Sequence, residues 1–211
     1  FDHLAVPSHV HNTFASPPGV VYRTIWTMPN RDSALLQTIT TSLCHMVDVH
    51  TMTMLSRMLP LADREIRLRP TDAERLQAQT HLKGAGMSRV VLVHAGKSLD
   101  EKALPAQWWQ ATVDALAQED LIVCLIGSTS TAPGDTMEVL PIACPAGGID
   151  LRNALALGSL FALIESAPVL LTGDSPLVQV AGAFDNWIVM LPAGKHPDLV
   201  FPYRQGTTRH K

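Results

Sequence analysis

Short runs of uncharged apolar residues recur at regular intervals through the second half of the chain, and segments with helical spacing lie between them. Runs without polar alternation are typical of strands in a parallel sheet that is covered on both faces. Strands that alternate with helices predict βαβ units and a doubly wound α/β sheet. The runs lie at residues 90–93, 121–126, 169–171 and 187–191, and the helical segments at 105–117, 160–167 and 177–183.

Weaker patterns complete this expected sheet. The segment 142–144 is apolar and predicts a short third strand, and a short helix is expected from Thr136. In the helix at 105–117, the spacing predicts an inward face made of Trp108, Val113, Leu116 and Ala117.

The first part of the chain has a different pattern. A short strand is expected at 4–6 and a β-branched, aromatic strand at 19–26. Residues 32–59 lack Gly and Pro and have apolar residues at helical spacing, which predicts one long helix or two consecutive helices. Residues 66–70 alternate like an exposed edge strand or an extended linker.

A charge-rich stretch separates these two parts and predicts a domain boundary. Within it, Thr71 followed by Glu74 has the spacing of a capping box, which predicts the start of a short polar helix. We therefore expect a partial N-terminal domain at residues 1–70, an interdomain segment at 71–88 and a C-terminal domain at 89–211.

Composition narrows the class of protein. The 211 residues are 46% hydrophobic and 17% charged, with a net charge of -3, which is globular and gives no basic footprint for nucleic acid. Three widely spaced cysteines indicate free thiols in a reducing, cytoplasmic compartment rather than a disulfide framework. No apolar run reaches the roughly 20 residues of a membrane span, and no signal peptide is visible.

A metal centre is not expected. His45, Asp48 and His50 lie close together in the helical region 32–59, but His50 falls well off the helical face of His45. A solvated or helix-packing role for these side chains is the favoured interpretation.

Candidate chemistry lies in three loops that follow predicted strands. Because the carboxyl ends of parallel strands share one edge of a sheet, these loops are expected to meet there. Their cations, backbone N–H groups and hydroxyls are what a diphosphate needs, and the N-cap expected at Ser175 opens a helix whose N-terminus favours an anion. The loops contain Gly96, Lys97 and Lys102; Ser128; and Asp174 with Ser175.

Several of these residues also have simpler interpretations. Lys102 fits a solvated surface lysine as well as a phosphate ligand, and His94 is more readily a half-buried structural histidine than a base. Trp108 and Trp109 fit packing of their helix on the sheet or the rim of a cleft better than stacking on a nucleobase.

The motifs also resemble those of a known family. His94-Ala95-Gly96, then Lys102 and Pro105-x-x-Trp108-Trp109, are followed by Thr172-Gly173-Asp174-Ser175 and Ala181-Gly182-Ala183. This order resembles the C-terminal domain of the lipopolysaccharide heptosyltransferases, glycosyltransferase family 9. The resemblance covers residues 89–204 well and residues 31–70 faintly.

The resemblance implies a GT-B-like fold, with a Rossmann-like doubly wound parallel sheet and part of a second Rossmann-like domain. It implies a glycosyltransferase that moves a sugar, such as a heptose, from a nucleotide-diphosphate donor to a saccharide or lipopolysaccharide acceptor, without a metal or other cofactor and in peripheral proximity to a membrane. Lys102 matches the family's loop lysine, which would neutralise donor phosphate charge. Asp174 and Ser175 match its donor-binding motif.

Some positions depart from the family pattern. Gln179 stands where many members have His, and Pro176 where many have Gly, which leaves the choice of sugar open. The glycine-rich start of the N-terminal domain is missing, so Phe1 is expected to lie inside that domain and the catalytic base upstream of it.

Two other functions remain open. One is a non-catalytic remnant of a GT-B protein that binds a nucleotide or a partner protein. The other is a sugar-nucleotide epimerase of related two-domain form, for which no acid and base residues are apparent.

Overall fold

The computed structural model describes residues 3–6, 21–24, 59–60, 63–82, 84–97, 103–130, 138–191 and 201–204. The chain divides into two compact units. One comprises Phe1–Arg64 with Pro197–Val200, and the other comprises Glu65–His196 with Phe201–Lys211. The helix predicted at 32–59 and the residues His45, Asp48 and His50 lie outside the described residues, apart from position 59.

The first unit contains two parallel strands, β1 (His3–Val6) and β2 (Val21–Thr24). They pair in register from His3 opposite Val21 to Val6 opposite Thr24. Both strands were expected from their apolar and β-branched residues, and β2 lies within the predicted 19–26. Parallel pairing requires a crossover connection, as Rossmann-like domains have.

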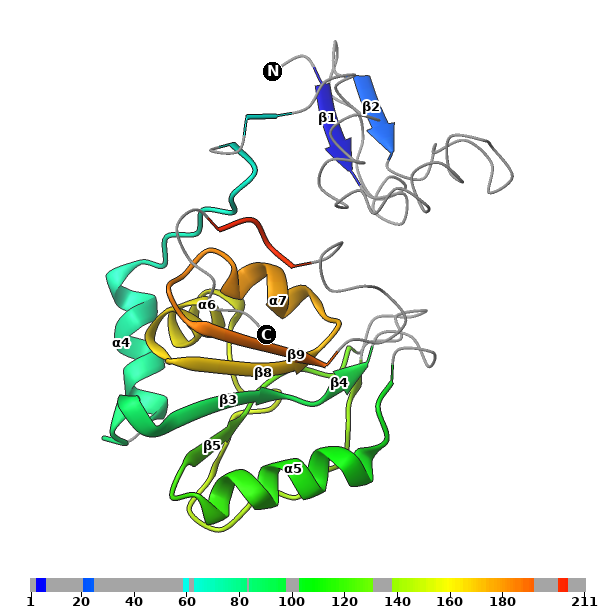
Figure 1. The fold of residues 1–211 in the computed structure, drawn as a ribbon. Helices are drawn as coiled ribbons and strands as arrows, with labels where there is room; N and C mark the ends of the chain where they lie inside the picture. The colour runs from blue at the N-terminus through cyan, green and yellow to red at the C-terminus, as the bar shows by residue number, and fades with distance from the viewer. Residues whose placement is uncertain are drawn as a thin grey trace. The chain divides into compact units, whose positions relative to one another are not determined.

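The second unit is built around a five-stranded, fully parallel sheet. Its spatial order is β7-β5-β3-β8-β9 (Figure 1). Numbered along the chain, these strands follow the doubly wound order 3-2-1-4-5, which is typical of a Rossmann fold. The fold class expected from the apolar runs is thus confirmed. The strands are β3 (Val90–His94), β5 (Ile122–Leu125), β7 (Ile149–Asp150), β8 (Val169–Gly173) and β9 (Trp187–Leu191).

Helices cover both faces of this sheet. Helix α5 lies on one face, and α4, α6 and α7 lie on the other (Figure 1). Two covered faces explain why the strands carry apolar residues at consecutive positions rather than in alternation. The helices are α4 (Asp72–His81), α5 (Ala106–Gln118), α6 (Leu157–Ser166) and α7 (Pro176–Ala181), and a single 3-10 turn, η3 (Met87–Arg89), precedes β3.

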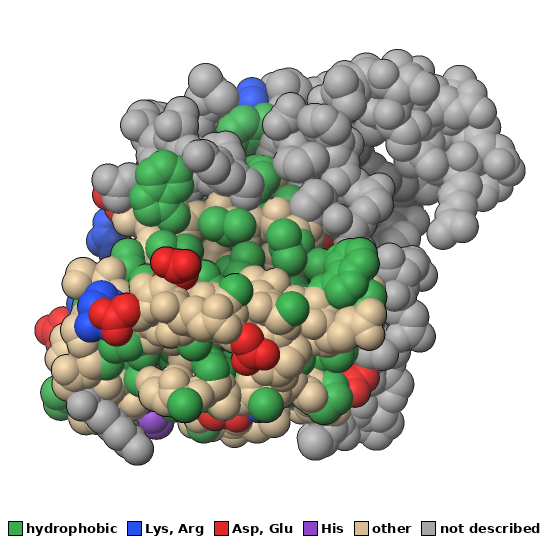
Figure 2. All heavy atoms as spheres, turned by 60° about the horizontal axis from the view of Figure 1, so that its bottom comes forward, with side chains coloured by type: hydrophobic (Ala, Val, Ile, Leu, Met, Phe, Trp, Pro, Cys, Tyr) green, Lys and Arg blue, Asp and Glu red, His purple; other side chains and the backbone are tan. Residues whose placement is uncertain are grey.

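The core between α5 and the sheet corrects one expectation. Val113 of α5 is fully buried against Val91 and Val93 of β3, as predicted. Trp109 is the buried tryptophan, however, whereas Trp108 is 60% exposed. The predicted inward face therefore holds at Val113 and Leu116, and only the choice between the two tryptophans was wrong. On the face that Figure 2 shows, acidic side chains lie scattered among hydrophobic and uncharged ones.

The region between β5 and α6 also differs from the prediction. Residues 142–144 form no strand; the third strand of the sheet is β7, which pairs with only two residues of β5. The short helix expected from Thr136 is contradicted at its described part, because Glu138–Val139 form strand β6. This strand pairs antiparallel with β4 (Gly96–Lys97), so it ties the segment directly after β3 to the chain beyond β5.

The predicted capping box is present at the start of α4. The Thr71 side chain accepts a hydrogen bond from the Glu74 backbone N–H, and the Glu74 carboxylate accepts one from the Thr71 backbone N–H at 2.6 Å. The bonds that the Thr71 backbone N–H and hydroxyl donate to this carboxylate lower the pKa of Glu74. Residues 66–70 just before the helix form no regular strand.

Helix α4 packs on α6 within the second unit. Arg75 donates two hydrogen bonds to the Glu165 carboxylate, at 2.7 and 3.1 Å, and Ser159 donates one to Gln77 at 2.7 Å. The predicted interdomain segment 71–88 thus contains a helix that contributes to the second unit's own packing.

The last described residues are attached to the end of α7. Arg204 donates to the carbonyl oxygens of Ala181 and Asn186, each at 2.8 Å, and to that of Phe184. These acceptors include the carbonyl group of Ala181, the last residue of α7, and the last four carbonyl groups of an α-helix have no intrahelical partner. Among the described residues, no helix combines the length and hydropathy that a bilayer crossing requires.

Candidate functional site

The strand order identifies where a doubly wound protein binds its ligand, at the carboxyl end of the sheet. After β3, the chain adds β5 and then β7 on one side of it, and β8 and β9 follow on the other side. The winding therefore reverses between β3 and β8. Helices on opposite faces separate there, and doubly wound proteins bind ligands at this position. We call it the switch point. His94 and Thr172, at the ends of these two strands, are register partners.

A chain of hydrogen bonds crosses the switch point. Nδ1 of His94 lies 3.1 Å from Oγ1 of Thr172, and this hydroxyl lies 2.9 Å from Oγ of Ser175. Thr172 is fully buried and His94 is 8% exposed, whereas Ser175 is partly exposed. The chain therefore leads from the interior of the sheet to the surface at its carboxyl edge.

Burial determines the charge of His94. Desolvation disfavours the imidazolium and lowers the pKa of His94 to about 4. At neutral pH the ring is therefore neutral, with one nitrogen that donates and one that accepts. The structural role that we favoured for His94 from the sequence agrees with this burial.

Two glycines enclose the His94 ring. A Cβ atom at position 96 would lie 2.5 Å from Nε2 of His94, and one at position 127 would lie 2.7 Å from Cδ2. Gly127 also has φ of 119°, a conformation that favours glycine. Gly96 and Gly127 lie in the segments after β3 and β5, so the imidazole is close to both segments and hydrogen-bonds to Thr172 near the end of β8.

The loop after β5 is braced by a side chain from the chain beyond β7. Asn153 accepts a hydrogen bond from the Thr129 backbone N–H at 2.8 Å and donates its own backbone N–H to the Gly127 carbonyl, also at 2.8 Å. Ser128, predicted to bind substrate, lies between these two attachments and is exposed. The backbone around its hydroxyl is therefore held in place while the side chain faces solvent.

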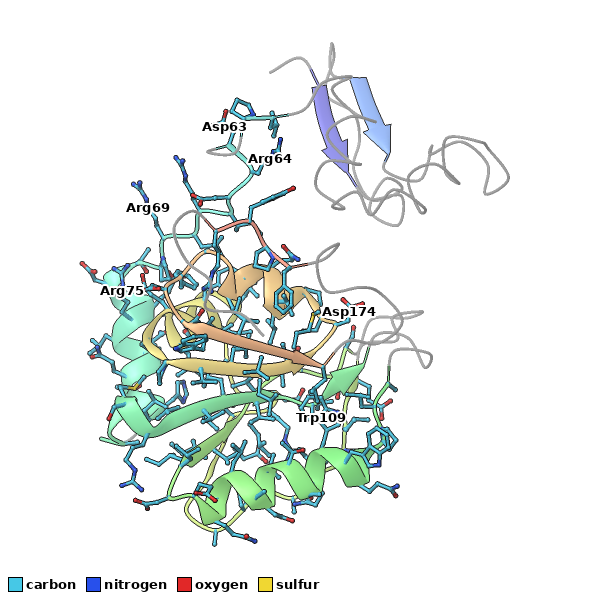
Figure 3. All side chains as sticks on the ribbon, viewed as in Figure 1. Asp63, Arg64, Arg69, Arg75, Trp109 and Asp174 are labelled. Carbon is cyan, nitrogen blue, oxygen red and sulfur yellow. The ribbon has the colours of Figure 1, made fainter. Side chains whose placement is uncertain are left out.

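The loop after β8 brings together two other predicted residues. Asp174 and Ser175 follow the strand directly and are both partly exposed (Figure 3). Ser175 occupies the N-cap position of α7, as expected, but its side chain makes no capping hydrogen bond. Its hydroxyl bonds to Thr172 instead. Gln179 lies within α7, which is only six residues long.

Trp109 reaches the same end of the sheet from α5. Figure 3 shows it near the carboxyl end at which Asp174 also lies. A Cβ atom at Gly173 would be 4.0 Å from Cζ2 of Trp109. Within the described part of the chain, the buried Nε1 of Trp109 has no hydrogen-bond partner. Buried indole N–H groups usually have one, so this donor is an exception beside the site.

The structure leaves some predicted residues without a described position. Lys102 lies outside the described residues, and of Lys97 only the backbone in β4 is described. Gly96, by contrast, has a clear role beside His94. Thr172 was missed as a functional candidate, although its place at the end of an apolar run, three residues before Ser175, was a usable signal. Over the described ranges, no group of three His, Cys, Asp or Glu side chains could hold a metal ion.

Comparison with known sequences identifies the family. The sequence model of glycosyltransferase family 9 (heptosyltransferase) matches residues 34–209. The chain belongs to this family. The match includes all three site loops, the switch point and α7, so the resemblance in the sequence motifs is confirmed. A search of curated proteins found no significant match.

Solved glycosyltransferase structures have the same fold. A family 9 glycosyltransferase from Veillonella parvula superposes with a TM-score of 0.59 at 17% identity, over 95% of this chain and 54% of that one. The Escherichia coli ADP-heptose lipopolysaccharide heptosyltransferase II gives 0.52 at 18% identity, over 69% and 44%. The E. coli iron-containing dodecameric glycosyltransferase TibC gives 0.51 at 16% identity, over 77% and 38%. The chain thus spans about half the length of these glycosyltransferase structures, or less.

Proposed function

We propose that this chain binds a nucleotide-diphosphate sugar at the switch point and serves in the transfer of that sugar, of the heptose class, to a saccharide or lipid-linked saccharide acceptor. Membership of glycosyltransferase family 9 supports a transferase. The observation that carries the donor site is the hydrogen-bonded chain His94–Thr172–Ser175, which ends at the surface where the winding of the sheet reverses. One similar structure is a TibC heptosyltransferase in complex with ADP-D-beta-D-heptose.

The residues at the switch point suit the two chemical parts of such a donor. The Ser175 hydroxyl and the loop N–H groups suit the diphosphate, because hydrogen bonds to charged oxygens are strong. The Asp174 carboxylate suits sugar hydroxyls, which donate to it. Around Asp174 and Ser175, the proposed binding residues are Gly96, Lys97, Ser128 and Gln179. The proposal requires no metal or other cofactor.

In the transfer itself, an acceptor hydroxyl forms a bond to the anomeric carbon and gives its proton to a base. The bond from that carbon to the donor's β-phosphate oxygen breaks, and both electrons leave with the nucleoside diphosphate. Negative charge therefore grows on the diphosphate in the transition state. Lys102 is proposed to neutralise this charge, which is the kind of electrostatic stabilisation that contributes most to many enzymes.

Donor binding can be tested on the chain directly. Isothermal titration with ADP and UDP, and with adenosine and uridine as controls, should show binding of at least one diphosphate that its nucleoside does not match. Replacing Lys102 by Ala should then weaken diphosphate binding further than replacing Lys83 by Ala, a lysine outside the three loops. Equal affinity for nucleoside and diphosphate would contradict the proposed donor site.

Turnover distinguishes an enzyme from a remnant that only binds. A longer chain carrying the N-terminal part of the family should release nucleoside diphosphate from an ADP- or UDP-sugar in the presence of a saccharide acceptor. Binding without release would favour the non-catalytic alternative. A cytoplasmic location close to a membrane, where lipid-linked acceptors are made accessible, follows from the same proposal.

A further inference from the structure

The hydrogen-bonded chain at the switch point can run in two directions. A threonine hydroxyl carries one proton, and Thr172 can give it along this chain either to His94 or to Ser175. If Nδ1 of His94 carries the ring proton, His94 donates to Thr172 and Thr172 donates to Ser175. The Ser175 proton is then available to a ligand.

The opposite direction changes what Ser175 presents at the surface. If Nε2 of His94 carries the proton, Nδ1 accepts from Thr172, and the contact between Thr172 and Ser175 requires Ser175 to donate inward. Ser175 then faces a ligand with oxygen lone pairs, which repel an anion. The tautomer of a buried histidine thus decides whether the exposed hydroxyl attracts or repels negative charge.

We propose that His94 and Thr172 are positioning residues that set the direction of the Ser175 hydroxyl, so that a bound diphosphate accepts its proton and holds His94 in the Nδ1–H tautomer. This inference rests on the donor site proposed above. His94 and Thr172 act through Ser175 in this inference, and neither needs to contact the ligand.

Two features make the ring a defined switch rather than a mobile group. Gly96 and Gly127 approach so closely that a Cβ atom on either would lie within 2.7 Å of ring atoms, which leaves little room for rotation of the imidazole. Burial also keeps the ring neutral at physiological pH, since it lowers the pKa of His94 to about 4. A neutral ring has a single proton, so Nδ1 either donates to Thr172 or accepts from it.

The tautomer can be read by NMR. Two-bond nitrogen–proton correlation spectra of the imidazole-labelled chain saturated with ADP should show His94 with its proton on Nδ1. A purely structural histidine has no reason to prefer this tautomer when the diphosphate is bound. An Nε2–H tautomer in the ADP complex would overturn the proposal.

A pair of substitutions at Thr172 isolates the hydroxyl from the packing. Thr172→Val keeps the shape and removes both hydrogen bonds, whereas Thr172→Ser keeps the hydroxyl and loses a methyl group. We expect Thr172→Val to bind ADP about tenfold more weakly, as for the loss of one hydrogen bond to a charged group. Thr172→Ser should retain most of the affinity, and both variants should bind adenosine as the unsubstituted chain does.

The outcomes separate this inference from the proposed function. If the unsubstituted chain binds none of ADP, UDP and inorganic pyrophosphate, the donor site and the positioning role both fail. If it binds ADP and Thr172→Val binds equally well, the donor site stands and the positioning role is wrong. Thermal unfolding of each variant confirms that weak binding does not reflect an unfolded chain.

Discussion

Nδ1 of His94 lies 3.1 Å from Oγ1 of Thr172, although 78 positions separate the two residues in the chain. The contact exists because β3 and β8 are neighbours in the sheet, with His94 and Thr172 in register. It joins the ends of two strands that begin different halves of a doubly wound sheet. The strand order thereby places the buried imidazole of His94 two hydrogen bonds away from the partly exposed Ser175.

His94 should make stability depend on pH. The pKa of His94 is about 4 in the folded chain, so the unfolded chain binds this proton at higher pH. The free energy of unfolding that the neutral ring contributes is complete above about pH 6.5, and it is lost as the pH falls from there toward about 4. Urea unfolding at about pH 7.5 and about pH 4.5 should differ by up to about 3 kcal/mol from this residue.

His94→Asn supplies the control for that measurement. The asparagine amide can replace the hydrogen bond of Nδ1 but does not titrate. The difference in unfolding free energy between the two pH values should therefore be smaller in this variant. An identical difference in both chains would show that other groups cause the acid sensitivity.

The two adjacent tryptophans should respond very differently to truncation. Trp109 is 1% exposed, and Trp109→Ala should reduce the free energy of unfolding by about 3–5 kcal/mol. Trp108 is largely exposed, so Trp108→Ala should change stability by about 0.5 kcal/mol or less. Chemical denaturation followed by circular dichroism measures both, and a larger loss at Trp108 would mean that the helix is turned the other way.

Trp109→Phe adds information about the unpartnered indole nitrogen. The substitution leaves a small cavity but removes a buried donor without a described acceptor. Since these two effects oppose each other, we expect a loss of about 1 kcal/mol or less. A much larger loss would indicate that the indole N–H does find a partner in solution.

Gly182 should not tolerate a side chain. A Cβ atom there would lie 2.2 Å from Cβ of Pro202, and a proline ring in the chain adjoining Arg204 has little freedom to move. Gly182→Ala should therefore loosen the attachment of residues 201–204 to α7 and destabilise the protein by about 1–3 kcal/mol.

Gly173→Ala is a matched control, because the nearest atom to its added Cβ is 4.0 Å away. We expect this second variant to unfold within about 1 kcal/mol of the unsubstituted chain. Similar losses at both glycines would show that glycine flexibility, rather than contact with Pro202, determines the result.

The described cysteines should differ in reactivity. Burial raises the pKa of Cys124 to about 12, and the side chain is fully buried in β5, so little thiolate forms and reagents cannot reach it. Cys144 is partly exposed, so reagents reach its thiol more easily than that of Cys124, although burial raises the pKa of Cys144 as well. Iodoacetamide labelling followed by peptide mass spectrometry should modify Cys144 well before Cys124. Equal rates would indicate frequent opening of the sheet around β5.

The sequence predicted the parts of the fold that rest on uninterrupted apolar runs. Strands β3, β5, β8 and β9 all fall on such runs, since burial on both faces leaves no room for polar alternation. Strand β7 was missed because only Ile149 and Asp150 pair with β5, and two residues at a sheet edge produce no run. The segment 142–144 is apolar for another reason: Ile142 is buried in the core under α5 without joining the sheet.

The candidate site was predictable in location but not in its internal contacts. Because the carboxyl ends of parallel strands share one edge of a sheet, the sequence predicted that the loops of Gly96, Ser128 and Ser175 lie near one another. The spatial order of the strands was needed to place His94 beside Thr172. No local pattern reports that pairing, because it depends on two crossovers on opposite sides of β3.

Gly96, Gly127 and His94 share one small volume, and this constrains how the protein can diverge. A methyl group at either glycine would occupy space that the imidazole now fills. A side chain at position 96 therefore requires a smaller residue at position 94. We expect the three positions to change together, although Gly127 follows a different strand from the other two.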